Sequence, residues 1–92
     1  MRIGTVLVSG PSMAPTLLSG DCLLVWRTNR VRPGDLVVGR FRTGYDGLVV
    51  KRAVAEQDGG WLLASDNPFG SSSGGLADVH AKVLLRYWPL RR

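Results

Sequence analysis

The chain has almost none of the residues that build many catalytic and metal sites. Among its 92 residues there is one cysteine, Cys22, and one histidine, His80. An intrachain disulfide is therefore excluded, as is a metal site made from several cysteine or histidine ligands, and we expect no metal and no cofactor. Cys22 lies in the apolar run Cys-Leu-Leu-Val-Trp, where a thiol usually acts as a small buried hydrophobic group, so we give it no catalytic role.

Long hydrophobic runs are also missing. No apolar stretch approaches the roughly 20 residues that a membrane-spanning helix needs, so we expect no transmembrane segment. The first residues, Met-Arg-Ile-Gly-Thr-Val-Leu-Val-Ser-Gly, are too short and too rich in β-formers for a signal peptide. We therefore expect a soluble, cytoplasmic protein.

Acidic residues are outnumbered, with 7 Asp and Glu against 12 Lys and Arg and a net charge of +5. The arginines are scattered through turns and strand ends, which favours a solvated basic surface, so no nucleic acid partner is expected. The alternative is a basic β-barrel that binds single-stranded nucleic acid, with aromatic residues as stacking platforms. The candidates for that role are Trp26, Phe41, Tyr45, Trp61 and Trp88.

The pattern of apolar clusters predicts an all-β fold. β-Branched and apolar residues recur at short intervals with turn residues between them, which is typical of strands and not of amphipathic helices. Asp46-Gly47 and Asp58-Gly59 are expected to be hairpin tips. Residues 1–92 then form a single domain of about six strands. The expected strands are Ile3–Val8, Cys22–Arg27, Leu36–Arg42, Leu48–Ala55, Trp61–Ala64 and Ala81–Trp88.

Two loops break this rhythm and carry hydroxyl groups, residues 9–17 and 65–75. Ser12 lies in the first, where two prolines stiffen the backbone. His80 has no recognisable partner motif for a Ser-His-Asp triad, so lysine is considered as a candidate base. A lysine serves as a base only if burial lowers its pKa from about 10.4 toward neutrality.

Lys51 stands in a strand that is apolar on both sides of it, although Lys82 has a similar context. From these residues alone, a turn serine and a surface lysine remain the alternatives to a nucleophile and its base.

Four blocks, taken in order, resemble the signal peptidase I superfamily of Ser/Lys peptidases, which is similar in fold to LexA-type self-cleaving repressors. The first block is Ser-Met-Ala-Pro-Thr-Leu at residues 12–17, followed by Gly20-Asp21, and the second is Pro-Gly-Asp-Leu-Val-Val at residues 33–38. The third is Val-Val-Lys-Arg-Ala-Val at residues 49–54, and the last begins with Ser-Asp-Asn-Pro at residue 65, where the family has Gly-Asp-Asn. The resemblance implies a small LexA/signal-peptidase-like β-barrel.

The resemblance also implies roles for individual residues. Ser12 would be the nucleophile, with its backbone amide in the oxyanion hole, and Lys51 the general base. Ser71 would hydrogen-bond this lysine. Met13 would line the substrate pocket, and Asp66 and Asn67 would brace the last loop, with Arg52 structural.

The chain departs from the family pattern at two places. The oxyanion-hole serine that signal peptidases often carry two positions before the nucleophile is replaced by Gly10, which leaves Ser9, one position further back, as the candidate donor. Ser73-Gly74-Gly75 stands where the family has Asp-Ser-Arg, so the salt bridge formed by that tripeptide is expected to be absent.

The tail Arg86-Tyr87-Trp88-Pro89 is most similar to the nickel-type superoxide dismutase maturation proteases. This implies a serine endopeptidase that binds its polypeptide substrate as an extended strand and removes a short N-terminal extension from a superoxide dismutase precursor. A general signal-peptidase-like processing protease and a non-catalytic peptide-binding protein are the alternatives.

Overall fold

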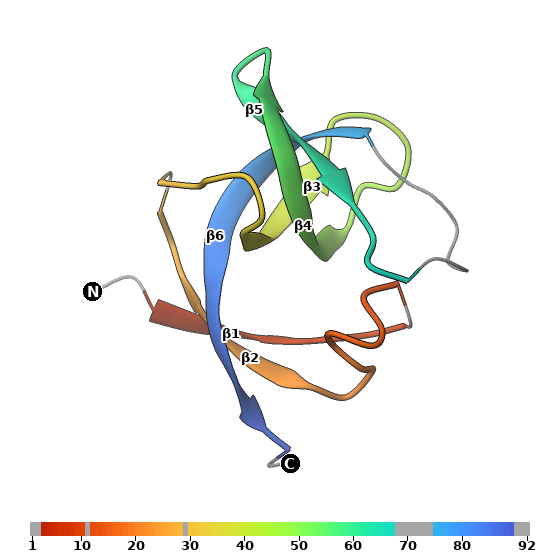
Figure 1. Cartoon of the computed structure of the whole chain (residues 1–92), viewed down its shortest axis with the longest axis vertical. Helices are drawn as coiled ribbons and strands as arrows, with labels where there is room; N and C mark the ends of the chain where they lie inside the picture. The colour runs from red at the N-terminus through yellow and green to blue at the C-terminus, as the bar shows by residue number, and fades with distance from the viewer. Residues whose placement is uncertain (1–2, 11, 29, 68–74, 90–92) are drawn as a thin grey trace.

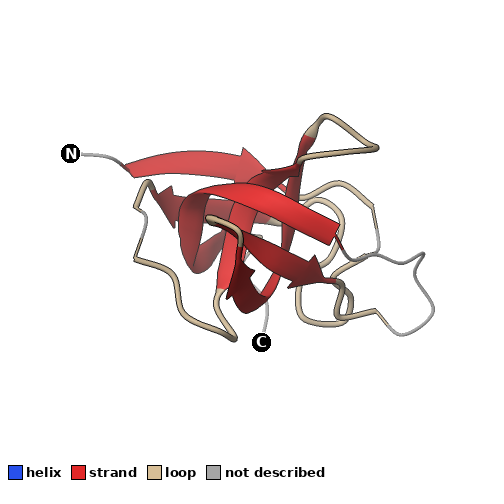
Figure 2. Cartoon of the chain, turned by 90° about the horizontal axis from the view of Figure 1, so that it is seen from above, coloured by secondary structure: helices blue, strands red, loops and turns tan. Residues whose placement is uncertain are grey.

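In the computed structural model, residues 3–10, 12–28, 30–67 and 75–89 are described, and they contain strands and connections without a helix (Figures 1 and 2). The strands are β1 (Ile3–Leu7), β2 (Cys22–Trp26), β3 (Leu36–Phe41), β4 (Leu48–Gln57), β5 (Gly60–Ala64) and β6 (Gly75–Trp88). The prediction of an all-β fold with about six strands is therefore confirmed.

The six strands form one antiparallel sheet in the order β1-β2-β6-β3-β4-β5, and β6 also pairs with β5. The long strand β6 holds this sheet together. Its start, Gly75–Ala77, pairs with β5, its middle with β3, and its end from Lys82 to Trp88 with β2. Because β6 bonds to both β3 and β5, strands β3 to β6 close into a ring, and β1 and β2 extend it on one side (Figure 1).

Two clusters of buried apolar side chains fill the interior. One lies inside the ring and consists of Val37, Ala53, Trp61, Leu63 and Ala77. The other joins β2, β3 and the middle of β6 to the loop after β1, and consists of Val8, Met13, Leu17, Leu23, Val25, Val38 and Ala81. Burial of one such large side chain stabilises the fold by about 1.5–3 kcal/mol, so the second cluster anchors that loop to the sheet.

Five of the predicted strands agree with the structure to within two residues at each end. The sixth prediction was wrong at its start, because β6 begins at Gly75 and not at Ala81. The segment between these positions contains Asp78 and His80 and has no apolar run. Pairing with β5 and β3 on its two edges nevertheless makes it a strand. Long-range hydrogen bonding thus overrides the local pattern.

Only one of the two predicted hairpin tips is a tip. Asp58 and Gly59 alone connect Gln57 to its pairing partner Gly60, and both have positive φ angles, 51° and 76°, as a tight hairpin turn requires. Asp46-Gly47 instead ends the longer connection of residues 42–47, in which Gly44 has the positive φ angle.

No helix with the length and apolarity needed to cross a membrane occurs among the described residues.

Candidate active site

The first half of β4 has one free edge. Leu48 to Arg52 pair with β3 on one side, but the ladder with β5 runs only from Arg52, opposite Ala64, to Gln57. The chain leaves β5 at Ser65, so residues 48–51 have no strand partner on that side within the described chain. Strand β1 is also at a sheet edge, since it pairs with β2 alone. Two stretches of unpaired backbone are therefore present.

These two edges border the same cleft, which has a volume of about 530 Å³. The end of β1 and the loop that follows it form one part of its lining, and the connection before β4 and the first half of β4 form another. The lining residues are Val6, Leu7, Val8, Ser9, Ser12, Met13, Val38, Tyr45, Leu48, Val49, Val50 and Lys51. Four of the residues expected in the site, Ser9, Ser12, Met13 and Lys51, are thus brought together.

The loop that carries Ser12 contains a short turn from Met13 to Leu17, and the residues at both ends of this turn are buried. Met13 is 1% exposed and Leu17 is also buried, and the backbone amide of Leu17 donates to the Met13 carbonyl oxygen over 2.9 Å. The Ser12 carbonyl oxygen accepts a hydrogen bond of 2.9 Å from the backbone amide of Asn67. Ser12 is therefore held by its own backbone and by the buried side chain that follows it, in the lining of the cleft.

Lys51 is half-buried, and its amine has lost part of its water. Burial lowers the pKa of Lys51 from its ordinary value, because an ammonium ion is poorly solvated there. The amine donates a hydrogen bond of 2.9 Å to Ser65 Oγ, at the exit of β5. This contact fixes the direction of the amine while leaving its lone pair available whenever it is uncharged.

Sequence reasoning missed Ser65. The partner expected for the lysine was Ser71, which lies outside the described residues. The available signal was the replacement of the glycine in Gly-Asp-Asn by a serine, which places a hydroxyl group directly before Asp66.

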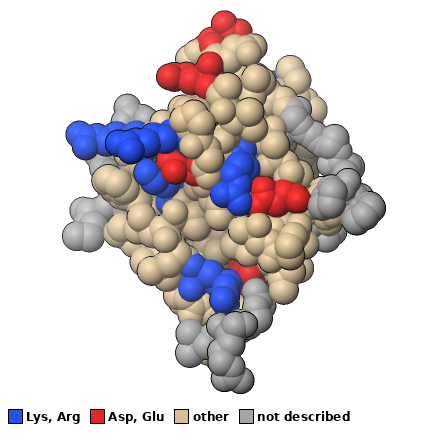
Figure 3. Space-filling view, in the orientation of Figure 1, with Lys and Arg blue, Asp and Glu red and all other residues tan. Residues whose placement is uncertain are grey.

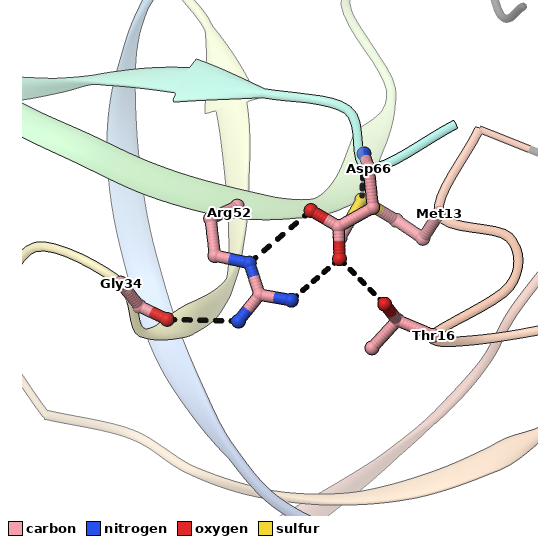
Figure 4. A network of polar contacts seen from close by, with 5 residues as sticks. All are labelled: Met13, Thr16, Gly34, Arg52 and Asp66. Carbon is pink, nitrogen blue, oxygen red and sulfur yellow. Dashed lines mark hydrogen bonds and ion pairs between the residues drawn. The ribbon is translucent and has the colours of Figure 1, made fainter. Parts of the chain in front are cut away.

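Asp66 connects three parts of the chain (Figure 4). Its carboxylate accepts hydrogen bonds from Arg52 Nε over 3.2 Å and from Thr16 Oγ1 over 2.7 Å, and Arg52 Nη2 forms an ion pair with it. Its backbone amide lies 3.4 Å from Met13 Sδ. The β5 exit is thereby tied to β4 and to the Ser12 loop, and the Arg52 guanidinium keeps the pKa of Asp66 below its ordinary value.

Asn67 adds the backbone bond to Ser12 described above, so both residues expected to brace the last loop contact the Ser12 loop. At the other end of the loop of residues 65–75, Ser73 and Gly74 lie outside the described residues, and Gly75 is the first residue of β6. The loop is therefore fastened at its start, beside Lys51.

The charges do not form one basic block. In the orientation of Figure 3, basic and acidic side chains are interspersed, and acidic groups gather where the β4–β5 hairpin lies. Two of the aromatic residues considered for nucleic acid stacking are unsuitable, because Trp61 is buried and Phe41 packs against the buried cluster inside the ring of strands β3 to β6. No cluster of three or more metal-binding side chains is found in the described parts of the chain.

Comparison with known protein families identifies a related family. The sequence model of the Peptidase S24-like family matches residues 3–73 of this chain. That span includes the Ser12 loop, both free edges of the cleft and the residues that tie Asp66 to its neighbours. A search of curated proteins finds no match.

The contacts of Asp66 predict a pH-dependent loss of stability in Asp66→Asn. The substitution removes an ion pair whose carboxylate is 19% exposed and should lower the free energy of unfolding by about 1–2 kcal/mol at pH 7. The lowered pKa of Asp66 means that its contribution is present above its unfolded pKa, about 3.9, and is lost as the pH falls through the lower folded value. Urea unfolding of both proteins at pH 7 and pH 3 measures this.

The control is Asp78→Asn, which removes the more exposed ion pair with Arg42, whose aspartate is 56% exposed. Surface pairs contribute little, so this variant should lose less than Asp66→Asn. Equal losses in the two variants would show that Asp66 is an ordinary surface residue.

Proposed function

Because the chain belongs to the Peptidase S24-like family, we propose that it is a serine endopeptidase with a Ser/Lys dyad, in which Ser12 is the nucleophile and Lys51 the general base. The observation that carries the proposal is that Ser12 and Lys51, 39 positions apart in the sequence, line one cleft, where burial lowers the pKa of the lysine. No histidine is available in this lining for the same task.

The reaction follows from the properties of the two groups. Uncharged Lys51 accepts the proton of the Ser12 hydroxyl as Ser12 Oγ attacks the scissile carbonyl carbon. The developing oxyanion is stabilised by the backbone amide of Ser12. The lysine then gives its proton to the departing amine, which leaves an acyl-enzyme on Ser12. The uncharged lysine next takes a proton from a water molecule as the water oxygen attacks the acyl carbon. When the bond from this carbon to Ser12 Oγ breaks, Lys51 returns the proton to Ser12 Oγ, which releases the acid product and restores both groups.

The substrate is an extended peptide that lies along the cleft. Its backbone would add to the free edge of β1 and to the free edge of β4 at residues 48–51, since both have unpaired hydrogen-bonding groups beside the cleft. Strand addition of this kind binds the backbone of any sequence and leaves specificity to the side-chain pockets. It also presents the scissile bond at the end of the cleft that holds Ser12 and Lys51.

The remaining site residues support the dyad. Ser65 orients the Lys51 amine, and Asp66 and Asn67 hold the Ser12 loop through the contacts described above. Met13 anchors the nucleophile loop in the core and contributes to the lining, and Ser9 is a candidate donor to the oxyanion. Ser71, as a second partner of the lysine, remains a proposal from the sequence.

The finer substrate assignment is the removal of a short N-terminal extension from a nickel-type superoxide dismutase precursor in the cytoplasm. Its support is the resemblance of the tail Arg86-Tyr87-Trp88-Pro89. Incubation of the protein with such a precursor and mass analysis of the products would test it. Cleavage of other peptides but not of this precursor would leave the more general processing protease.

Substitution of either dyad residue should abolish peptide cleavage. We expect Ser12→Ala and Lys51→Met each to lower kcat/KM by a factor of about 10³ or more, because members of a dyad act as a unit. Both variants should keep the wild-type circular dichroism spectrum, since neither side chain belongs to the buried clusters.

The control is the chain's other lysine. Lys82 forms an ion pair with Asp35 and is not part of the cleft lining, so Lys82→Met should retain most of the activity. The dyad would be ruled out by a fully active Lys51→Met or Ser12→Ala variant.

The rate of cleavage should rise with pH. Lys51 can act as a base only when it is uncharged. Because its pKa is lowered, the uncharged form is populated at a lower pH than for an exposed lysine. A plot of kcat/KM against pH from 6 to 10 should rise and then level off below the ordinary lysine pKa of about 10.4. A rate that does not change over this range would contradict a lysine base.

Ser65→Ala should weaken catalysis without weakening substrate binding. Loss of the hydrogen bond from Lys51 Nζ frees the amine to leave its reactive direction, and we expect kcat to fall roughly tenfold while KM stays close to its wild-type value. Ser65→Thr keeps a hydroxyl group and should restore most of the rate. If Ser65→Ala raised KM alone, Ser65 would contact the substrate and would not orient the lysine.

A further inference from the structure

Tyr45 is an exposed aromatic residue at the cleft. It lies on the connection of residues 42–47, is 67% exposed and belongs to the cleft lining. It makes no hydrogen bond or ion pair with any of the described residues. Its ring is therefore largely open to solvent in the lining of the cleft, and no described polar group binds it.

The ring has a defined seat. A Cβ atom added at Gly47 would lie 2.4 Å from the Tyr45 hydroxyl oxygen and 2.6 Å from its ring carbon Cζ. The φ angle of Gly47 is not positive, so the backbone there does not itself require glycine. The absence of a side chain at position 47 instead makes room for the ring of Tyr45 to lie against the backbone.

Tyr45 and Lys51 line the same cleft from two different parts of the chain. Lys51 is three strand positions from Leu48, which corresponds to roughly 10 Å, and Tyr45 precedes Leu48 on the chain. Leu48, 54% exposed, and Leu7 of β1, 66% exposed, line the cleft together with Tyr45. The cleft thus carries three exposed apolar side chains, and among the described lining residues Lys51 alone is charged.

We propose that Tyr45, seated on Gly47, determines specificity by contacting an aromatic or branched apolar side chain of the substrate about three positions from the scissile bond. This inference rests on the proposed peptidase function and adds a substrate class to it. When such a side chain covers the exposed ring of Tyr45 and the exposed leucines Leu7 and Leu48, apolar surface is removed from water, and this makes the free energy of binding more favourable. A polar or charged side chain would gain no partner there.

The test is a cleavage profile on a proteome-derived peptide library, with cleavage sites identified by mass spectrometry. The wild type should show enrichment of aromatic or branched apolar residues at one position two to four residues from the cleaved bond. Tyr45→Ala should still cleave but lose the enrichment, with kcat/KM for preferred peptides reduced about three- to tenfold, mainly through KM. Gly47→Ala should have the same effect because its new methyl group displaces the ring.

The control is Leu84→Ala, which alters an exposed apolar residue of β6 that does not line the cleft and should keep the wild-type profile. A profile without enrichment in the wild type, or with enrichment that survives in Tyr45→Ala, would overturn the inference while leaving the peptidase function intact.

A second measurement separates the two claims. The same library is passed over immobilised Ser12→Ala protein with and without Tyr45→Ala, and the retained peptides are identified. If the wild type cleaves nothing but Ser12→Ala retains apolar peptides through Tyr45, the peptidase proposal fails together with the position relative to a scissile bond, and only the contact of Tyr45 with an apolar peptide side chain stands. If there is neither cleavage nor Tyr45-dependent retention, both fail.

Discussion

The site depends on the partial burial of one amine. A lysine in water is charged at neutral pH and cannot accept a proton, so any role for Lys51 as a base requires an environment that disfavours the ammonium ion. The fold supplies this environment at the position where β5 leaves β4, because Lys51 lies there at a free strand edge, in the lining of a mostly apolar cleft. Among the described residues, the hydroxyl group of Ser65 is the one hydrogen-bond partner of the Lys51 amine.

The end of β5 also positions the loop that carries Ser12, the proposed nucleophile. Once the chain leaves the sheet at Ser65, the next two residues, Asp66 and Asn67, reach the Ser12 loop and bind it through a carboxylate and a backbone amide. Arg52, the neighbour of Lys51, holds Asp66 from β4. Lys51 and Ser12, the proposed base and nucleophile, are therefore positioned by residues that are adjacent to each other in sequence, Ser65, Asp66 and Asn67.

The sequence predicted most of the fold, and the failures have physical causes. Strand β2 and the hairpin at Asp58-Gly59 follow from local apolar and turn chemistry. The start of β6 does not, because it becomes a strand through pairing with two distant strands and has little apolar content of its own. The connection before β4 was expected to turn at Asp46-Gly47, but Gly47 instead accommodates the ring of Tyr45, a contact that turn preferences cannot express.

For the site, the sequence predicted which residues to consider, through a resemblance, but not their contacts. Ser71, the expected partner of Lys51, lies outside the described residues, and that expectation stays a prediction. Ser65 was not predicted as a partner, because the direction of a side chain at the end of a strand decides which hydroxyl the amine can reach. The free edge of β4 was likewise invisible, since it depends on where β5 stops pairing.

The most direct measurement is the titration of the Lys51 side chain by NMR, with ¹³C-labelled lysine and the Cε signal assigned by comparison with Lys51→Met. The account predicts a pKa clearly below the ordinary lysine value of about 10.4, in the intact protein and without substrate. A pKa at or above that value would mean that the amine is hydrated and charged at neutral pH, and the Ser/Lys mechanism would be contradicted.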